Sequence, residues 1–156
     1  MLTIRQWKKS DIDAVYRIEV ECFRSPWSKL SLLGELRNKL AYYKVVELEN
    51  KIIGYCGMWL LYDEAHITNI AISKEYRGNG YAQKLLIEMM KTAVYFDASM
   101  MTLEVREHNI AAQNLYHKLG FIKEGERKRY YQDTGESAYL LWNRNIKETV
   151  KRYEDQ

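Results

Sequence analysis

The feature that most constrains the fold of this chain is a short glycine-rich loop, Arg77-Gly78-Asn79-Gly80-Tyr81-Ala82. It follows a strand-like run at residues 65–72 and precedes a run at residues 81–96 that carries apolar side chains at helical spacing. A strand, a glycine turn and a helix in this order place free main-chain N–H groups and the positive end of a helix dipole at one point. The loop therefore predicts a phosphate-binding site at the start of a helix.

Two well-known nucleotide motifs do not fit this loop. No Gly-Lys-Ser/Thr follows it, as a nucleoside triphosphatase would need, and it lacks the Gly-x-Gly-x-x-Gly of dinucleotide-binding folds. Taken alone, Gly78 and Gly80 also suit an ordinary turn that binds nothing. The rest of the sequence is needed to choose between a phosphate-binding loop and an ordinary turn.

Composition and charge are those of an ordinary globular protein. The 156 residues, 47% hydrophobic and 29% charged, are enough for one compact domain, which we place at residues 1–146, followed by a polar tail at 147–156 that we expect to fray. The net charge of +3 would not by itself drive binding to nucleic acid or to a membrane. We expect neither as a partner.

No apolar run has the length of a signal-peptide core or of a membrane span, so we expect a cytoplasmic protein. Cys22 and Cys56 match no metal or redox spacing and are expected to be buried and reduced. His66, His108 and His117 lack a second ligand at metal spacing, so we predict no metal site.

Periodicity and turn residues predict an order of elements along the chain. Strands are expected at residues 2–7, 42–47, 52–62, 65–72, 100–105, 121–128 and 138–144. Helices are expected at residues 11–23, 28–40, 81–96 and 110–119, with Ser28 capping the second and Gly120 ending the last.

The loop and this order of elements together resemble the GNAT acetyltransferase superfamily, whose signature is Arg/Gln-x-x-Gly-x-Gly/Ala. Ala82 stands where glycine is more frequent. The resemblance covers nearly the whole chain and implies an α+β fold, with a mostly antiparallel sheet of about seven strands flanked by about four helices. It also implies that acetyl-CoA is the co-substrate and that the loop cradles its pyrophosphate.

Further segments are similar to the ribosomal-protein-alanine N-acetyltransferases, which acetylate the N-terminal alanine of ribosomal small-subunit protein eighteen. These segments are residues 23–28, 64–72, 103–106, 109, 114–121 and 127–131. The similarity implies an enzyme that moves acetyl from acetyl-CoA to a protein N-terminus.

The same similarity implies roles for individual residues. Glu104 would be the general base and Tyr116 the general acid. The cofactor site would comprise the main chain of Ile70, Ala71 and Ile72 together with Arg77, Gly78, Asn79, Gly80, Tyr81, Ala82 and Asn109. The walls of the acceptor-peptide channel would be Trp27, Tyr130 and Tyr131.

Each role has a simpler alternative. Glu104 also suits a solvated strand carboxylate or an ion pair with Arg106, and Tyr116 suits a core aromatic on an apolar helix face. The aromatic residues of the channel also suit packing. The basic run at residues 127–129 suits either an acidic or ribosomal partner or a solvated strand end.

Other functions also remain open. The same fold acts on lysine side chains and small amines, and an intact loop would equally serve a non-catalytic acetyl-CoA-binding scaffold. A nucleic-acid-binding module fits the small net charge poorly.

Overall fold

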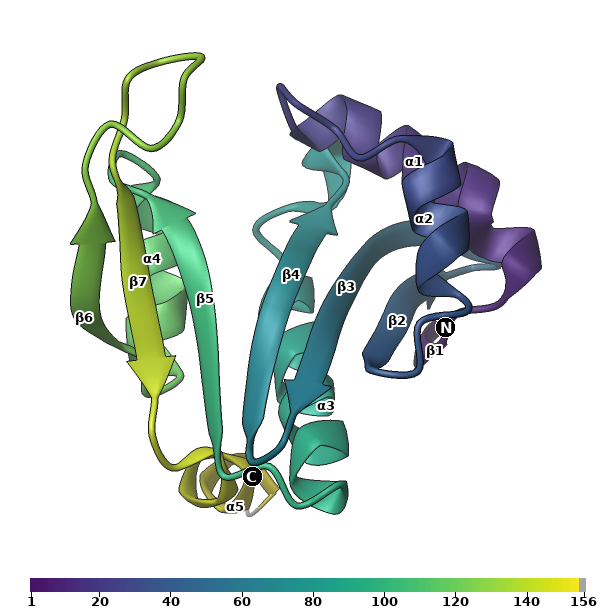
Figure 1. Ribbon diagram of the computed structural model, residues 1–156. Helices are drawn as coiled ribbons and strands as arrows, with labels where there is room; N and C mark the ends of the chain where they lie inside the picture. The colour runs from purple at the N-terminus through teal and green to yellow at the C-terminus, as the bar shows by residue number, and fades with distance from the viewer. Residues whose placement is uncertain (155–156) are drawn as a thin grey trace. The chain divides into compact units, whose positions relative to one another are not determined.

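In the computed structural model, which describes residues 1–154, the chain forms seven strands and five α-helices (Figure 1). The strands are β1 (Leu2–Gln6), β2 (Ala41–Leu48), β3 (Lys51–Leu61), β4 (Glu64–Ile72), β5 (Met100–Arg106), β6 (Ile122–Arg127) and β7 (Ala138–Asn143). The helices are α1 (Ile12–Cys22), α2 (Lys29–Glu35), α3 (Tyr81–Tyr95), α4 (Ile110–Lys118) and α5 (Ile146–Glu154).

The seven strands are hydrogen-bonded in the order β1-β2-β3-β4-β5-β7-β6. β4 and β5 run parallel, whereas β2 is antiparallel to both β1 and β3, and β7 to both β5 and β6. The expected α+β class with a mostly antiparallel sheet is therefore confirmed. None of the helices among residues 1–154 is long and apolar enough to cross a membrane.

The chain divides into two compact units. The first contains residues 1–59 and 68–89, and the second contains residues 60–67 and those from 90 onward. β3, β4 and α3 contribute residues to both units. A single domain over residues 1–146 stays a prediction.

The core of the first unit lies where α1 and α2 pack against β2 and β3 (Figure 1). Trp7 stacks on Tyr43, with ring centroids 4.1 Å apart and an interplanar angle of 12°. The Ser28 side chain accepts a hydrogen bond from the Ser31 main-chain N–H at 3.0 Å, so the expected cap of α2 is confirmed.

α2 is shorter than predicted, because it ends at Glu35 and not near residue 40. The N–H groups of Leu36, Arg37 and Asn38 each bond the carbonyl three residues earlier, which tightens the chain into a turn. The Asn38 side chain then accepts from Leu40 N at 3.0 Å and continues that turn toward β2. The sequence pattern did not separate this turn from the helix.

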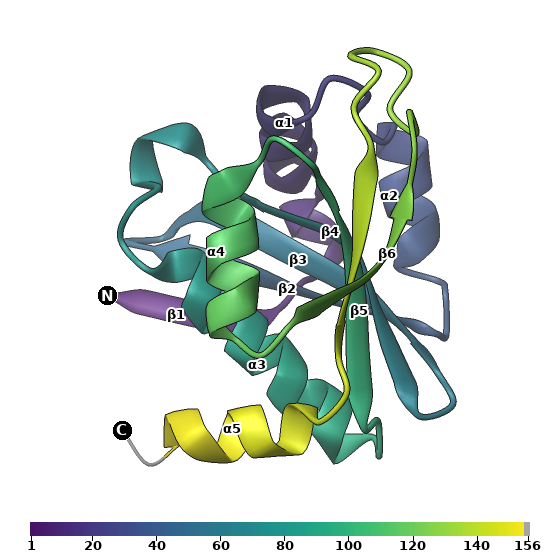
Figure 2. The same ribbon diagram turned by 90° about the vertical axis from the view of Figure 1, so that its left-hand side faces the viewer.

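In the second unit α4 covers one face of the strands β5, β7 and β6 (Figure 1 and Figure 2). α4 ends at Lys118, and Gly120, two residues further on, has a φ of +92°, the left-handed conformation expected after this helix. The buried Asn143 side chain donates to the Leu119 carbonyl at 2.9 Å and thus joins β7 to the end of α4.

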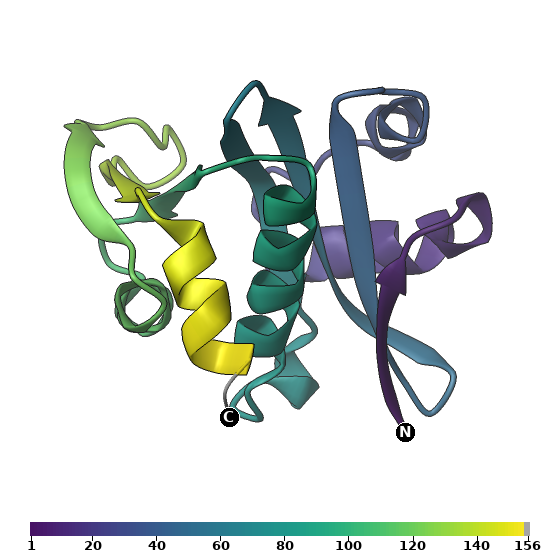
Figure 3. The same ribbon diagram turned by 90° about the horizontal axis from the view of Figure 1, so that it is seen from below.

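The C-terminal tail at residues 147–156 was expected to fray, and for residues 147–154 this prediction was wrong, because they belong to the helix that begins at Ile146. This helix is α5, which follows β7 (Figure 3). Ile146, Thr149 and Val150 are buried on one side of it, which gives the helix an apolar stripe despite its polar composition. The last two residues of the predicted tail, 155 and 156, lie outside the described residues.

Candidate functional site

The glycine loop joins β4 to α3 in the first unit. Gly78 and Gly80 have φ angles of +82° and +80°, which side-chain-bearing residues rarely adopt. A Cβ atom built at either position meets no other atom within 4 Å. The glycines are therefore required for the backbone conformation, and the main chain beside them is open to a ligand.

Two side chains hold this loop in place. The Arg77 guanidinium donates to the Ile72 carbonyl at 2.9 Å and to Cys22 Sγ at 3.3 Å. Asn79 Nδ2 donates to the Tyr76 carbonyl at 3.0 Å. Arg77 thus ties the loop to the end of β4 and to α1, a structural task that the signature by itself did not reveal. Its role toward a cofactor stays a prediction.

Helix α3 begins directly after the loop, since Lys84 N bonds the Gly80 carbonyl at 3.1 Å as an α-helical bond. The N–H groups at Tyr81 and Ala82 come before this bond and have no acceptor within the helix. They lie at the positive end of the helix dipole. Open glycine backbone and a helix N-terminus together fit the pyrophosphate of acetyl-CoA.

The end of β4, predicted to carry the pantetheine-binding edge, is well packed. Ala71 and Ile72 are buried, and Ile70 is partly exposed. The Ile72 carbonyl already accepts a hydrogen bond from the Arg77 side chain. The proposed contacts of Ile70, Ala71 and Ile72 with the cofactor stay a prediction.

Trp27 lies in the segment between α1 and α2, and a buried glutamate holds it there. Glu19, 1% exposed, accepts a hydrogen bond from the Trp27 main-chain N–H at 2.7 Å. The same carboxylate accepts from the Tyr55 hydroxyl and from Asn69 Nδ2, the latter at 3.3 Å. Burial and the neighbouring carboxylate raise the pKa of Tyr55, so its hydroxyl stays protonated and donates.

A second buried glutamate, Glu35, accepts a similar set of hydrogen bonds. It accepts from Tyr43 Oη at 3.0 Å, from Trp59 Nε1 at 2.7 Å and from Asn38 Nδ2 at 3.0 Å. Neither Glu19 nor Glu35 was predicted as a site residue from the sequence. The available signal for Glu19 is an acid that directly follows the buried residues Val15 and Ile18 on the apolar face of α1.

In the second unit, Glu104 lies on β5 opposite Leu140 of β7 and is exposed. Its carboxylate pairs with Arg127 Nε at 3.3 Å. Arg106, the partner considered from the sequence, instead pairs with Asp133 at 3.0 Å. An ion pair of Glu104 is present, but its partner comes from β6.

Tyr116 lies on α4 and is only 7% exposed. Its ring packs edge-on against Phe121 at 5.9 Å between centroids. The alternative of a core aromatic is therefore correct for the ring, and the acid role of the hydroxyl stays a prediction. Asn109 caps α4, because its Oδ1 accepts from Ala112 N at 3.2 Å.

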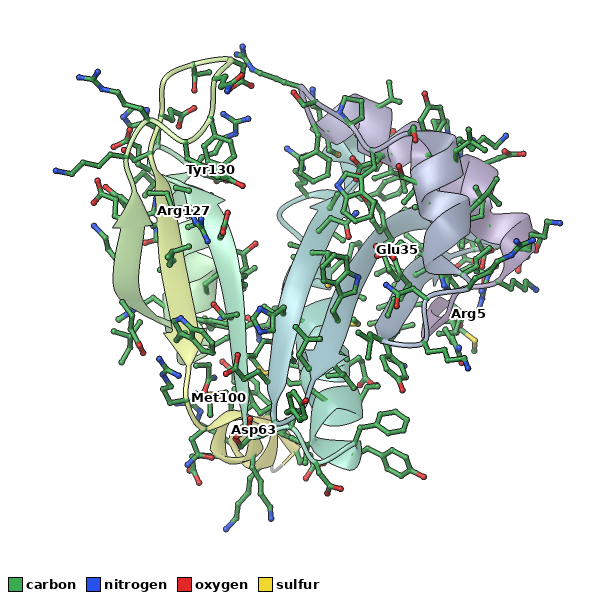
Figure 4. The ribbon with its side chains drawn as sticks, in the orientation of Figure 1. Arg5, Glu35, Asp63, Met100, Arg127 and Tyr130 are labelled. Carbon is green, nitrogen blue, oxygen red and sulfur yellow. The ribbon has the colours of Figure 1, made fainter. Side chains whose placement is uncertain are left out.

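Tyr130 and Tyr131 lie side by side in the segment between β6 and β7, with ring centroids 5.2 Å apart. Tyr130 is 49% exposed and lies beside Arg127, as Figure 4 shows. Partial burial raises the pKa of Tyr131, and the negative charge of Glu104 raises it further. The second unit thus brings Tyr131 near Glu104.

Two of the three histidines pair with acids. His66 Nε2 lies 2.9 Å from Glu64 Oε1, and His108 Nδ1 lies 3.3 Å from Glu136 Oε2. Within residues 1–154 no group of three or more His, Cys, Asp or Glu side chains is arranged to hold a metal ion.

The units divide the predicted residues between them. Trp27, Ile70–Ile72 and the glycine loop belong to the first unit, whereas Glu104, Asn109, Tyr116, Tyr130 and Tyr131 belong to the second.

Comparison with known proteins gives a consistent result. A model of the acetyltransferase (GNAT) family matches residues 12–121. The "Putative ribosomal protein bS18-alanine N-acetyltransferase" of Bacillus subtilis is 44% identical over 140 residues, 89% of this chain and 93% of the relative. The ribosomal protein bS18-alanine N-acetyltransferase of Haemophilus ducreyi is 35% identical over 79% of this chain and 84% of its own.

Among solved structures, the ribosomal-protein-S18-alanine N-acetyltransferase of Escherichia coli superposes with a TM-score of 0.85 at 28% identity, over 91% of this chain and 92% of that one. The fold and the sequence are thus both similar to those of these relatives over most of the chain. The chain therefore belongs to the acetyltransferase (GNAT) family and is an acetyl-CoA-dependent N-acetyltransferase.

Proposed function

We propose that this enzyme acetylates the α-amino group of an N-terminal alanine, and that ribosomal small-subunit protein eighteen is its acceptor. The relatives from Bacillus subtilis, Haemophilus ducreyi and Escherichia coli are named for this activity. The observation that carries the chemistry is the exposed Glu104 carboxylate in the unit that also holds Tyr116 and Tyr131.

The glycine loop of the first unit is the proposed pyrophosphate site. The phosphate oxygens would accept hydrogen bonds from the main-chain N–H groups at Gly78, Gly80 and Ala82 and would lie at the N-terminus of α3. The main chain at residues 70–72 would align the pantetheine. In the second unit, Asn109 is the residue proposed for cofactor binding. The residues then hold the thioester for attack without a metal ion.

Glu104 is the proposed general base. A protein α-amino group has a pKa of about 7.7 to 8.0 and is mostly protonated at neutral pH, so it must lose a proton before it attacks. Glu104 takes this proton directly or through one water, a step that typically contributes about 10² to 10⁴ in rate. Arg127 would orient the carboxylate through its ion pair.

Tyr116 is the proposed general acid. A main-chain N–H near Ile70 would stabilise the oxyanion that forms when the amine attacks the thioester carbonyl. Tyr116 then protonates the departing coenzyme A thiolate, which a phenol with a pKa of about 10 does at neutral pH. Trp27, Tyr130 and Tyr131 would line the path of the acceptor peptide.

The test is acetylation of peptides that differ only in their first residue. The enzyme with acetyl-CoA should release thiol with alanine-led peptides and label their α-amino group. The Glu104→Gln variant serves as the control, and about a hundredfold slower turnover is expected for it.

The result also separates the competing acceptors. Equal competition by a free polyamine, or labelling of a lysine side chain in place of the N-terminus, would favour a small-amine or lysine acetyltransferase. No thiol release with any peptide would contradict the proposal.

A further inference from the structure

Arg106, at the end of β5, makes an unusually complete set of contacts within the second unit. Its Nη1 and Nη2 donate to the two carboxylate oxygens of Asp133, each at 3.0 Å. Such paired bonds between a guanidinium and a carboxylate are shorter and stronger than neutral hydrogen bonds and fix the angle between the two planes. Asp133 lies in the segment from Lys128 to Ser137 that joins β6 to β7, hereafter the β6–β7 loop.

Further contacts of Arg106 reach three more positions in the β6–β7 loop. Nη1 lies 3.3 Å from Thr134 Oγ1 and 3.4 Å from Glu136 Oε1. The guanidinium carbon lies 3.9 Å from the centre of the Tyr131 ring. The hydrogen bond with Asp133 raises the pKa of Arg106 further above its usual range, so the cation is permanent. One side chain thus binds the tip of the loop through an ion pair and a ring contact.

The base of the β6–β7 loop is held separately. Ser137 N donates to Glu107 Oε1 at 2.8 Å, and Glu107 N donates to the Ser137 carbonyl at 3.0 Å. At the tip, Gly135 N donates to the Tyr131 carbonyl at 2.8 Å, and Gly135 has a φ of +77°. The tip is therefore a turn that Arg106 binds through Asp133, Thr134 and Tyr131, whereas Glu136 is also paired with His108 and the base is bound by Glu107.

Arg106 and Glu104 are two residues apart on β5, so their side chains leave the same face of the strand. Tyr131 stacks on Arg106, and its pKa is raised in part by the charge of Glu104. The ring that Arg106 holds is thus one that lies near the proposed base. This links the position of the loop tip to the chemistry at Glu104.

We propose that Arg106 is a positioning residue, which holds Tyr131 and the tip of the β6–β7 loop in the conformation that receives the acceptor peptide beside Glu104. This inference rests on the proposed function of the site. A lysine cannot replace the arginine, because an ammonium group does not form the bidentate pair with Asp133 while stacking flat on the Tyr131 ring.

Three variants test the proposal. Arg106→Lys keeps the positive charge and removes the planar guanidinium that donates through two nitrogens. Asp133→Asn removes the negative charge of the acceptor and keeps the size of the side chain. The matched control is Arg144→Lys, because Arg144 also binds one carboxylate, Glu124, through two nitrogens and stacks on Trp142 at 4.0 Å without touching the loop.

Steady-state kinetics with an alanine-led peptide give the first measurement. Arg106→Lys should raise the KM for the peptide about tenfold, and Asp133→Asn should raise it less, with the KM for acetyl-CoA changed less than about twofold in both. Arg144→Lys should match the wild type. An unchanged peptide KM, or a fall confined to kcat, would overturn the proposal, as would an equal rise in both KM values.

Hydrogen exchange of the main-chain amides gives a second measurement that needs no substrate. In Arg106→Lys the Tyr131 and Gly135 amides should exchange faster, whereas the Ser137 amide at the base of the loop should not change. Equal acceleration at all three amides, or none, would overturn the proposal. A wild-type enzyme inactive on every peptide would contradict the proposed function, and the amides would still decide whether Arg106 holds the loop tip.

Discussion

At the scale of single residues, the candidate site is built from side chains whose partners determine what they can do. Glu104 is exposed and bound by Arg127, and Arg106 is fully engaged by Asp133, Thr134 and Glu136. Because Arg106 is committed to the β6–β7 loop, the ion pair of Glu104 comes from β6. A base that is accessible and oriented by one arginine suits proton transfer.

Tyr116→Phe tests whether the hydroxyl of Tyr116 has a chemical role. The variant keeps the ring that packs on Phe121, so folding and acetyl-CoA binding should be retained, while kcat falls about 10² or more. Turnover is followed by thiol release, and cofactor binding by calorimetry. Unchanged turnover would refute the acid role, and a protein that binds acetyl-CoA but shows no turnover even as wild type would be a scaffold.

At the scale of elements, the loop between β4 and α3 combines a backbone conformation that residues other than glycine rarely adopt with an open surface. Gly78 and Gly80 adopt the left-handed conformation, and the side chains of Arg77 and Asn79 donate to the Ile72 and Tyr76 carbonyls. The loop is thus a rigid support for a ligand. A substitution at Gly78 or Gly80 would change the backbone conformation of the loop more than its side-chain contacts.

Gly80→Ala should therefore weaken acetyl-CoA binding, although the added methyl group meets no neighbour. A left-handed alanine costs about 1 to 2 kcal/mol, which corresponds to roughly a tenfold higher KM for acetyl-CoA if the loop relaxes out of shape. The matched control is Gly34→Ala in α2, where a Cβ also meets nothing within 4 Å and no positive φ is needed. That control should raise the melting temperature slightly, since alanine favours helix, and should leave the KM unchanged. An equal KM in both variants would contradict this account of the loop.

At the scale of the whole molecule, stability rests on buried apolar side chains and on buried polar contacts. In the first unit, Arg5 on β1 forms a two-armed pair with the buried Asp11, at 2.8 and 3.0 Å. Lys8 N also donates to Asp11 Oδ2 at 2.9 Å. The Arg5 hydrogen bonds, followed by the one from Lys8, hold the pKa of Asp11 below its usual value.

This shift predicts how stability depends on pH. A carboxyl group whose pKa is lowered by folding stabilises the protein fully at pH values above its unfolded pKa of about 3.9. This contribution is lost as the pH falls through the lower pKa of the folded state. Asp11→Asn should lower the free energy of unfolding by about 1.5 to 3 kcal/mol at pH 7, and the difference from wild type should shrink below about pH 4.

Urea unfolding at several pH values measures this difference. Asp13→Asn is the control, because Asp13 is exposed and its ion pair with Lys29 lies in solvent, so little change is expected. A difference for Asp11→Asn that persists undiminished into acid would contradict the assigned cause.

The sequence by itself determined most of the elements, the glycine loop and the family of this protein. Helical spacing, strand-like runs and the Ser28 cap depend on residues close together in the chain, and the left-handed conformation at Gly78 and Gly80 is a local property of glycine. The same reasoning failed at α5, where Ile146 and Val150 are too few apolar residues to outweigh a polar composition until a core is there to receive them.

Only the tertiary structure decided which charges meet. The partners of Arg106 lie 27 to 30 residues further along the chain, and the donors that satisfy the buried Glu19 lie up to 50 residues away. Strand register and the packing of helices on the sheet bring such groups together, and neither can be inferred from the spacing of residues along the chain. For this reason the sequence offered Arg106 as an alternative ion-pair partner for Glu104, whereas in the fold the partner is Arg127.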